Sequence, residues 1–273
     1  MKKLYTILRW ELKFVRFLSK QIRALFVRNE RVCLSTCTEF SEKFNAESWS
    51  LIKSNIELPK IDIMGLEGIA EGKAFVDVGK KFLEERSKIF CDVMKNPEIE
   101  KLVIDYFDGS PWLWNMAINY SDISKGTSSS QLWHFDYGDT KQLHVMVYLS
   151  DVCEEAGPFT FMKRETSDKV KRNIFRIERF TDEQLEHKFG INAKSKMKKA
   201  IGKRGDIWIV DPGKLLHQGA RCSVPRLVAF ITFTSRSPMS SGGKSTIDKK
   251  DRMKLYEDYI SHSKGILNQN VFY

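Results

Sequence analysis

Short segments rich in valine, isoleucine and aromatic residues constrain the fold of this chain more than any other feature. They lie between about residues 112 and 235 and are bounded by glycine, proline and aspartate. β-Branched and aromatic residues favour strands, and the bounding residues favour turns. The segments read LWNMAINYSDI, QLHVMVYLSDV, GPFTFM, GDIWIVD and RLVAFITFTSR. The pattern predicts a mainly β protein with a jelly-roll core and flanking helices.

The segments on either side of this core are expected to be helical. In residues 38–110, the stretches GKKFLEERSKIFCDVMKN and PEIEKLVIDYF repeat apolar residues three and four positions apart, which indicates supporting helices. Residues 236–273 are interpreted as a C-terminal tail with a loop and a short charged helix. We expect residues 31–273 to form one domain, since a chain of 273 residues can bury a sizeable core.

A basic insert of about residues 163–204 interrupts the predicted core. It is expected to be helical, because Thr181 suits an N-cap, Gln184 completes a capping box and Gly190 ends the helix. The insert carries fourteen Lys and Arg residues against six acidic residues, a charge of +8. Such a charge can form a solvated face, or it can cover an adjacent site.

The first 30 residues predict a basic amphipathic helix, with apolar residues at helical spacing and a charge of +7 over residues 1–28. We expect this helix to pack on the domain with its charged face in water. Contact of residues 1–28 with a membrane surface is the alternative. Because the whole chain has a net charge of +10, the part outside the two basic segments is acidic.

Cysteine usage and hydropathy predict a cytoplasmic protein. The five cysteines are scattered, odd in number and form no CxxC pair, as is typical of reduced thiols. No apolar run approaches the length that spans a bilayer. The start of the chain is interrupted by charge every few residues, which makes it a poor secretory signal.

The stretch QLWHFDYGD places His134 and Asp136 two residues apart, in a chain with only five histidines. In a strand these side chains would share one face and could reach a single metal ion. The pair alone is weak evidence, because an aspartate that caps a turn beside a locally hydrogen-bonded histidine gives the same pattern. Trp133 and Phe135 would lie on the opposite face and are expected to pack in the core.

A downstream motif strengthens the metal interpretation. In GDIWIVDPGKLLHQGARCSVPRLVAFITF, His217 follows a strand and a turn, and Arg226 begins the next strand. Two histidines and one carboxylate form the facial triad of non-haem iron oxygenases, which leaves three metal positions open for an α-keto acid and oxygen. Arginine suits the far carboxylate of that acid, because its planar guanidinium stays charged when buried.

The sequence resembles the phytanoyl-CoA dioxygenase-like family in a combination of four motifs. These are HxD, YLSDV with GPF, GD-strand-turn-His and an arginine at the start of a strand. The resemblance covers the predicted core and implies an iron(II)- and 2-oxoglutarate-dependent dioxygenase on a double-stranded β-helix, a cupin-like jelly roll. It implies that iron(II) is bound by His134, Asp136 and His217, and that the 2-oxoglutarate carboxylate is bound by Arg226.

Two residues near the second histidine bear on this assignment. Family members often carry a hydroxyl-bearing residue two positions after the distal histidine, where this chain has Gly219. The contact of that hydroxyl with 2-oxoglutarate is therefore absent or moved. Arg221 competes with Arg226 for the carboxylate, but Arg221 precedes the strand, so Arg226 is favoured.

The resemblance also implies the reaction and its partners. Molecular oxygen and 2-oxoglutarate would oxidise a small molecule and yield succinate. The presence of Asp136 favours hydroxylation or another oxidation, because related halogenases lack this carboxylate. Inserts of jelly-roll oxygenases often cover the mouth of the site, so the charge of residues 163–204 predicts an anionic substrate.

Other functions fit the sequence less well. A non-catalytic jelly-roll binding protein would not need all four site residues. A nucleic-acid-associated oxygenase is suggested by a pI of about 9.3, but there is no continuous basic and aromatic stripe, so no nucleic acid is expected as a partner. A zinc hydrolase would give Arg226 no role.

The remaining histidines are expected to be structural. His144 lies in a predicted strand, where packing is favoured over support of a metal ligand. His187 falls in the capped helix of the insert and is expected on the surface. His262 lies in the C-terminal helical stretch and has no evident metal partner.

Overall fold

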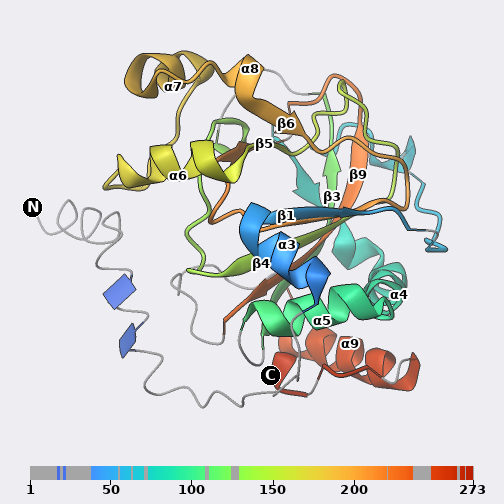
Figure 1. Cartoon of the computed structure of the whole chain (residues 1–273). Coiled ribbons are helices and arrows are strands. Elements are labelled where there is room, and N and C mark those ends of the chain that lie inside the picture. The colour runs from blue at the N-terminus through green and yellow to red at the C-terminus, as the bar shows by residue number, and fades with distance from the viewer. Residues whose placement is uncertain are drawn as a thin grey trace, which may run out of the picture.

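The structure is a computed structural model, which describes residues 38–54, 56–62, 64–70, 73–107, 111–123, 129–219, 221–235, 247–262, 265–267 and 269–272, with 17–18 and 21–22. Its strands are β1 (Trp49–Ile52), β2 (Val76–Asp77), β3 (Trp112–Ser121), β4 (Gln142–Tyr148), β5 (Thr160–Met162), β6 (Met197–Lys199), β7 (Ile207–Val210), β8 (His217–Gln218) and β9 (Arg226–Thr234). They form a six-stranded antiparallel sheet in the order β1-β7-β4-β9-β3-β2 and a three-stranded sheet in the order β6-β5-β8 (Figure 1).

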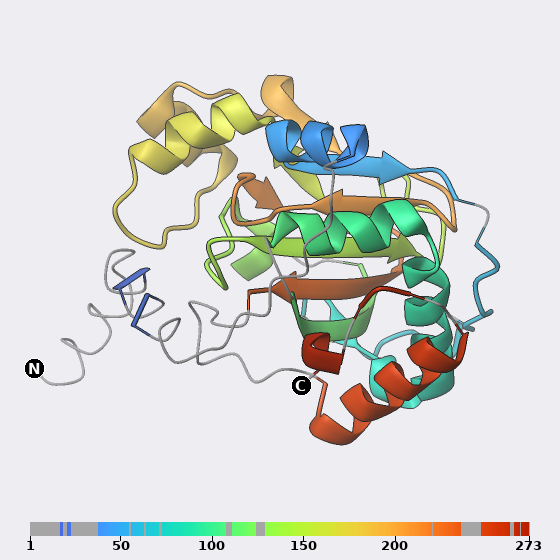
Figure 2. The same cartoon turned by 60° about the horizontal axis from the view of Figure 1, so that its bottom comes forward.

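The helices are α3 (Glu39–Glu47), α4 (Leu83–Met94), α5 (Pro97–Tyr106), α6 (Arg164–Arg172), α7 (Asp182–Phe189), α8 (Ala193–Lys196) and α9 (Lys249–His262). Short 3-10 helices are η1 (Met64–Leu66), η2 (Gly79–Lys81), η3 (Ser129–Gln131) and η4 (Gln269–Val271). The helices α4, α5 and α9 lie against the outer face of the six-stranded sheet (Figure 2).

Strand alternation divides the large sheet into two faces. On β4, Leu143, Val145 and Val147 pack into the main core beneath the helices. The intervening Met146 and Tyr148 pack on the other side, in a second core between the two sheets. This two-sheet arrangement with flanking helices confirms the predicted jelly-roll architecture.

The predicted helical region 38–110 is not wholly helical. It also contains β1, which pairs with β7, and β2, which pairs with β3, so these two strands form the edges of the large sheet. Strands of four and two residues are too short to show a hydrophobic period in the sequence. These two strands are defined by their pairing with β7 and β3, and the sequence gives no signal of that pairing.

The insert is helical over much of its length, and its predicted cap is confirmed. The Thr181 hydroxyl accepts a hydrogen bond from the Gln184 amide at 3.2 Å, and the Gln184 side chain accepts one from the Thr181 amide at 2.9 Å. Gly190 ends α7 with a φ of 65°, a left-handed conformation that glycine adopts without strain. The end of the insert differs from the prediction, because β6 pairs with β5.

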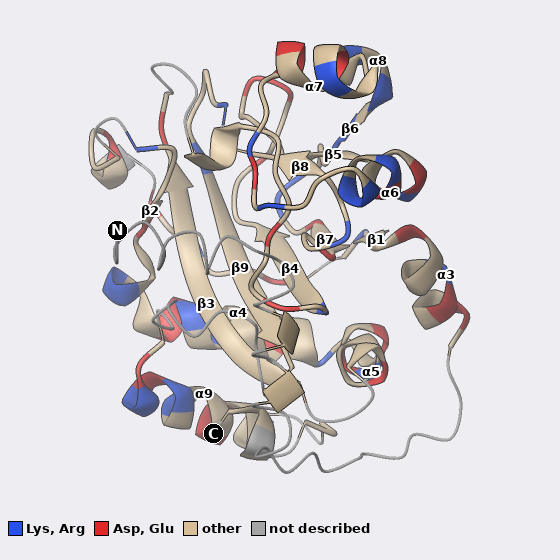
Figure 3. Ribbon diagram, turned by 90° about the vertical axis from the view of Figure 1, so that its left-hand side faces the viewer, with Lys and Arg blue, Asp and Glu red and all other residues tan. Residues whose placement is uncertain are grey.

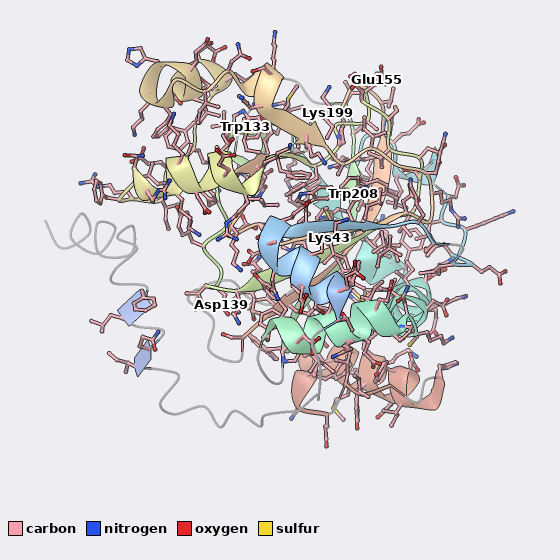
Figure 4. All side chains as sticks on the ribbon, in the orientation of Figure 1. Lys43, Trp133, Asp139, Glu155, Lys199 and Trp208 are labelled. Atoms are coloured by element: carbon pink, nitrogen blue, oxygen red, sulfur yellow. The ribbon has the colours of Figure 1, made fainter. Side chains whose placement is uncertain are left out.

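A third core lies between the insert and the small sheet. Trp133 and Phe135 are buried there, as predicted, and pack with Met162, Val170 and Leu185. Figure 4 labels Trp133 among the insert helices. This core fixes the chain on both sides of His134.

The C-terminal segment belongs to the main core. Helix α9 confirms the predicted charged helix, and Leu255, Tyr259 and Phe272 are buried under the large sheet. The basic helix predicted for residues 1–30 lies outside the described residues, apart from 17–18 and 21–22, which are helical. None of the described helices is both long enough and apolar enough to cross a membrane.

Candidate metal centre and its cavity

Three side chains with metal-ligating atoms converge at one point. The ligand atoms of His134, Asp136 and His217 all lie within 4.8 Å of one another. Asp136 Oδ1 lies 3.5 Å from His134 Nε2 and 3.9 Å from His217 Nε2. Within the described part of the chain, no other group of three His, Cys, Asp or Glu residues meets this condition. The structure therefore brings together the three residues that the sequence singled out as iron ligands.

Backbone pairing holds the two histidines side by side. The His134 amide donates to the His217 carbonyl at 2.8 Å, and the His217 amide donates to the His134 carbonyl at 2.9 Å. The Asp136 amide donates to the Pro212 carbonyl at 3.0 Å, in the turn after β7. The strand considered for His134 and Asp136 is not formed: Trp133 and His134 make isolated bridges with Phe180 and His217, and irregular chain follows.

Each imidazole is oriented by the carbonyl two residues before it. His134 Nδ1 lies 2.7 Å from the Leu132 carbonyl, and His217 Nδ1 lies 3.0 Å from the Leu215 carbonyl. A carbonyl oxygen only accepts, so both Nδ1 atoms carry the proton and both Nε2 atoms keep a free lone pair. Phe159 stacks on the His217 ring with centroids 4.8 Å apart, which fixes the ring plane.

The protonation states at the site also suit a metal ion. Burial, together with the neighbouring His134, lowers the pKa of His217 to about 3. Burial opposes ionisation of Asp136, but its contacts with the imidazoles of His134 and His144 outweigh burial and hold the pKa of Asp136 well below its ordinary value. At neutral pH, His217 is therefore neutral and Asp136 is ionised, which are the forms that bind metals.

His144 contacts the second oxygen of the metal-site carboxylate. Its Nε2 lies 3.2 Å from Asp136 Oδ2, and its Nδ1 lies 2.9 Å from the Thr232 hydroxyl. The sequence favoured a packing role for this strand histidine and kept support of a ligand as the alternative. The contact with Asp136 agrees with the alternative.

Arg226 is buried at the start of β9 and lines the same cavity as the three ligands. Its Nε has no hydrogen-bond partner, and no carboxylate among the described residues forms an ion pair with it. Arg221 differs, because its guanidinium donates to the Gln131 carbonyl at 2.8 Å and pairs with Asp182 at 3.3 Å. An unpaired buried guanidinium requires an anion, so Arg226 is the arginine available to one.

The cavity has a volume of about 370 Å³ and lies against the inner face of the large sheet. Sequence reasoning missed several polar residues that line it, among them Asp77, Asn115, Asn119 and Arg179. Strand alternation could have identified the two asparagines as facing away from the main core. The other two lie on a two-residue edge strand and an irregular stretch of the insert, where the sequence has no periodic signal.

The basic insert contributes little of its charge to this cavity. Lys and Arg gather on α6 and α8 (Figure 3), but Arg179 is the one insert residue that lines the cavity. Lys199, labelled on β6 in Figure 4, pairs with Glu154 at 2.9 Å, and Lys198 lies 3.8 Å from the centre of the Trp49 ring. Lys198 and Lys199 are thus engaged elsewhere, and none of the lysines of 194–199 lines the cavity.

No family model and no curated protein matches this sequence. Solved structures match it at low identity. The structure of EctD from S. alaskensis with 2-oxoglutarate and 5-hydroxyectoine is 12% identical, covers 76% of this chain and 79% of its own, and has a TM-score of 0.50. The epimerase SnoN with Fe3+, alpha ketoglutarate and nogalamycin RO is 12% identical over 77% and 92%, with a TM-score of 0.46. HygX from Streptomyces hygroscopicus with nickel and 2-oxoglutarate is 11% identical over 74% and 88%, with a TM-score of 0.44.

At these identities the likeness establishes architecture alone. The EctD match covers 76% of the chain. The chain therefore has the double-stranded β-helix fold that its sequence predicted.

Proposed function

We propose that this protein is an iron(II)- and 2-oxoglutarate-dependent dioxygenase that hydroxylates a small organic molecule carrying an acidic group. One observation carries the proposal: a His-Asp-His cluster and a buried, unpaired Arg226 line a single cavity. The fold shared with EctD, whose structure holds 2-oxoglutarate and 5-hydroxyectoine, supports it. The motifs of the sequence resemble those of the phytanoyl-CoA dioxygenase-like family, and we propose membership of that family as the more specific assignment.

The donor set fits iron(II). Two neutral imidazole nitrogens and one carboxylate oxygen form the set that non-haem iron oxygenases use, and it leaves coordination positions open. Asp136 can offer Oδ1 to the metal, because His144 engages Oδ2. Bound iron(II) would supply the activation of molecular oxygen, which no side chain of the cavity can provide.

The remaining residues orient the reactants and exclude water. Arg226 would bind the far carboxylate of 2-oxoglutarate through its guanidinium, which fixes the direction of that molecule in the cavity. Phe159, Val228 and Phe230 supply apolar wall around the ligands. Arg179 is an exposed cation on the same cavity, and it supports a substrate with an acidic group.

The test is succinate release from 2-oxoglutarate by purified protein supplied with iron(II) and air. Asp136→Ala should abolish release, because it removes a metal ligand and leaves two histidines. His187→Gln, on the insert surface, should release succinate at the wild-type rate. Unchanged iron binding and turnover in Asp136→Ala would refute the metal assignment, and iron binding without any succinate would indicate a non-catalytic binding protein.

The arginine assignment has its own variants. Arg226→Gln should raise the KM for 2-oxoglutarate by about tenfold to a hundredfold, since it removes a charge-assisted pair. Arg221→Gln should leave that KM unchanged, because Arg221 is engaged by Asp182 and lies off the cavity. The reverse result would assign 2-oxoglutarate to Arg221.

A further inference from the structure

The cavity keeps a polar wall after the residues proposed for iron and 2-oxoglutarate are set aside. Asp77 on β2 and Asn119 on β3 are direct partners across the strand pair, and both line the cavity. Asn115 lies on the same strand face, and its side-chain oxygen is buried without a hydrogen-bond partner. Buried polar atoms without a protein partner call for a hydrogen-bonding ligand or water. This wall is therefore suited to a ligand that donates hydrogen bonds.

Asp77 gives this wall a carboxylate that forms no ion pair within the described part of the chain. Its Oδ1 accepts hydrogen bonds from the Gly79 amide at 2.8 Å and the Ile118 amide at 3.1 Å. These bonds hold the carboxylate in place on a half-buried strand. Among the described residues, no Lys, Arg or His forms an ion pair with Asp77. The carboxylate thus remains available to a cation from outside the protein.

Arg179 supplies the opposite charge. Its Nε donates to the Ser129 carbonyl at 3.1 Å, and no carboxylate in the described part of the chain pairs with its guanidinium. It is exposed and lines the cavity from the insert, whereas Asp77 lines it from the large sheet. The two charges therefore reach the cavity from different elements.

The charges of the cavity identify what the substrate must carry. Asp136 is balanced by the metal, and Arg226 is balanced by the co-substrate carboxylate. One carboxylate and one guanidinium remain, at Asp77 and Arg179. A purely anionic substrate would leave the carboxylate of Asp77 without a cation. A purely cationic substrate would leave the guanidinium of Arg179 without an anion. Both arrangements are unfavourable in a partly desolvated site.

We propose that the substrate is a small zwitterion of the amino-acid type. Its ammonium group pairs with Asp77 and hydrogen-bonds to the neighbouring Asn119, and its acidic group pairs with Arg179. The inference rests on the proposed dioxygenase function and adds an amine to the acidic group named there. It also gives Asp77 a role beyond the turn that its Oδ1 stabilises.

The experiment compares zwitterions with their single-charge counterparts. The probes are glycine, β-alanine, γ-aminobutyrate and ε-aminocaproate, each with the matched acid that lacks the amine and the matched amine that lacks the acid. Binding is measured by calorimetry on the full chain with iron(II) and 2-oxoglutarate, without oxygen. At least one zwitterion should bind about tenfold or more tightly than both of its counterparts. If none does, the proposal is wrong.

Three variants assign the preference to residues. Asp77→Asn keeps an oxygen for the Gly79 and Ile118 amides but removes the charge, so the preference for zwitterion over acid should disappear. Arg179→Gln should remove the preference for zwitterion over amine. Arg176→Gln, a neighbouring exposed arginine that does not line the cavity, should change neither. A zwitterion preference that survives both of the first two substitutions would overturn the proposal and leave Asp77 a purely structural residue.

The same measurements separate this inference from the proposed function. A zwitterion preference without any succinate release from 2-oxoglutarate would refute the dioxygenase and leave the ligand class standing. Succinate release with no zwitterion preference would refute the ligand class alone.

Discussion

The two histidines among the candidate iron ligands are oriented by the same kind of backbone contact. In both cases Nδ1 faces the carbonyl of the residue two positions earlier, at Leu132 and at Leu215. The tautomer with a free Nε2 is therefore set by the chain's own backbone before any metal arrives. The histidines could be identified in the sequence from their spacing and strand context. The carbonyl contacts could not be predicted, because they depend on backbone turns that no residue type indicates.

His144 should act as a positioning residue for Asp136. His144→Ala should weaken metal binding by about tenfold to a hundredfold, because it removes the contact that holds Oδ2 and so leaves the carboxylate free to rotate. His144→Gln can still donate a hydrogen bond and should recover part of the affinity. Competition with a chelator measures the dissociation constant for iron(II) or nickel(II).

The control for this variant is His262→Ala, on the exposed end of α9. It removes a histidine without touching the site, so metal affinity should stay at the wild-type value. Equal affinities for His144→Ala and wild type would show that the Thr232–His144–Asp136 contacts are packing alone.

The metal-free protein should lose stability as the pH falls below 6.5. The pKa of His217 is about 3 in the folded chain against an ordinary 6.5, so between these values the unfolded chain binds a proton that the folded chain does not. Stability therefore falls with decreasing pH in this window, by up to about 1.4 kcal/mol per pH unit from this group. Asp136, with a pKa also below its ordinary value, adds a loss at lower pH.

Urea denaturation of chelator-treated protein at about pH 7 and about pH 5 measures this effect. His217→Gln should reduce the difference in free energy of unfolding between the two pH values, because the titrating imidazole is gone. His187→Gln should not, since His187 lies on the insert surface. The same pH difference in wild type and His217→Gln would contradict the assignment.

At the scale of elements, prediction succeeded where the composition of a segment marks a strand, which includes the short strands β5 and β7, and failed where pairing alone defines it. The strands β3, β4 and β9 have seven to ten mostly buried residues, rich in β-branched, aromatic and other apolar side chains, so their composition marks them. The strands β1, β2 and β6 have two to four residues, and the last is MKK, a sequence with no strand character. Their existence depends on the hydrogen bonds of their neighbours.

The same contrast explains which parts of the site could be foreseen. His134, Asp136, His217 and Arg226 lie in or beside predicted strands, so residue type and spacing were sufficient to select them. Asp77 could not be selected in this way, because its strand is an edge of two residues. Residues that recognise a substrate commonly lie at such irregular positions, where the sequence shows no periodic pattern.

At the scale of the whole molecule, the C-terminal segment packs against helices far from it in sequence. Phe272 is 1% exposed and its ring lies 5.6 Å from that of Phe90 on α4 and 5.3 Å from that of Tyr256 on α9. The final residues therefore complete the layer of helices that supports the large sheet. Their apolar character was visible in the sequence, but their partners lie far away along the chain.

Phe272→Ala should lower the free energy of unfolding by about 3–5 kcal/mol, the usual cost of emptying a buried aromatic site. Ile266→Ala, at a side chain that is 42% exposed in the same segment, should cost less than about 1 kcal/mol. Chemical denaturation measures both. Similar losses for the two variants would show that the C-terminal segment is not part of the cooperative core.

The mutual backbone hydrogen bonds of His134 and His217 have a consequence for how the protein acquires its metal. They join two segments that are distant in sequence, so the entropy of closing that long loop is lost during folding and not during metal uptake. Iron would meet a site already assembled, unlike a zinc finger that needs its metal in order to fold. If the proposed iron site is correct, the chain would fold empty, and its loading would be a separate event governed by the supply of iron in its surroundings.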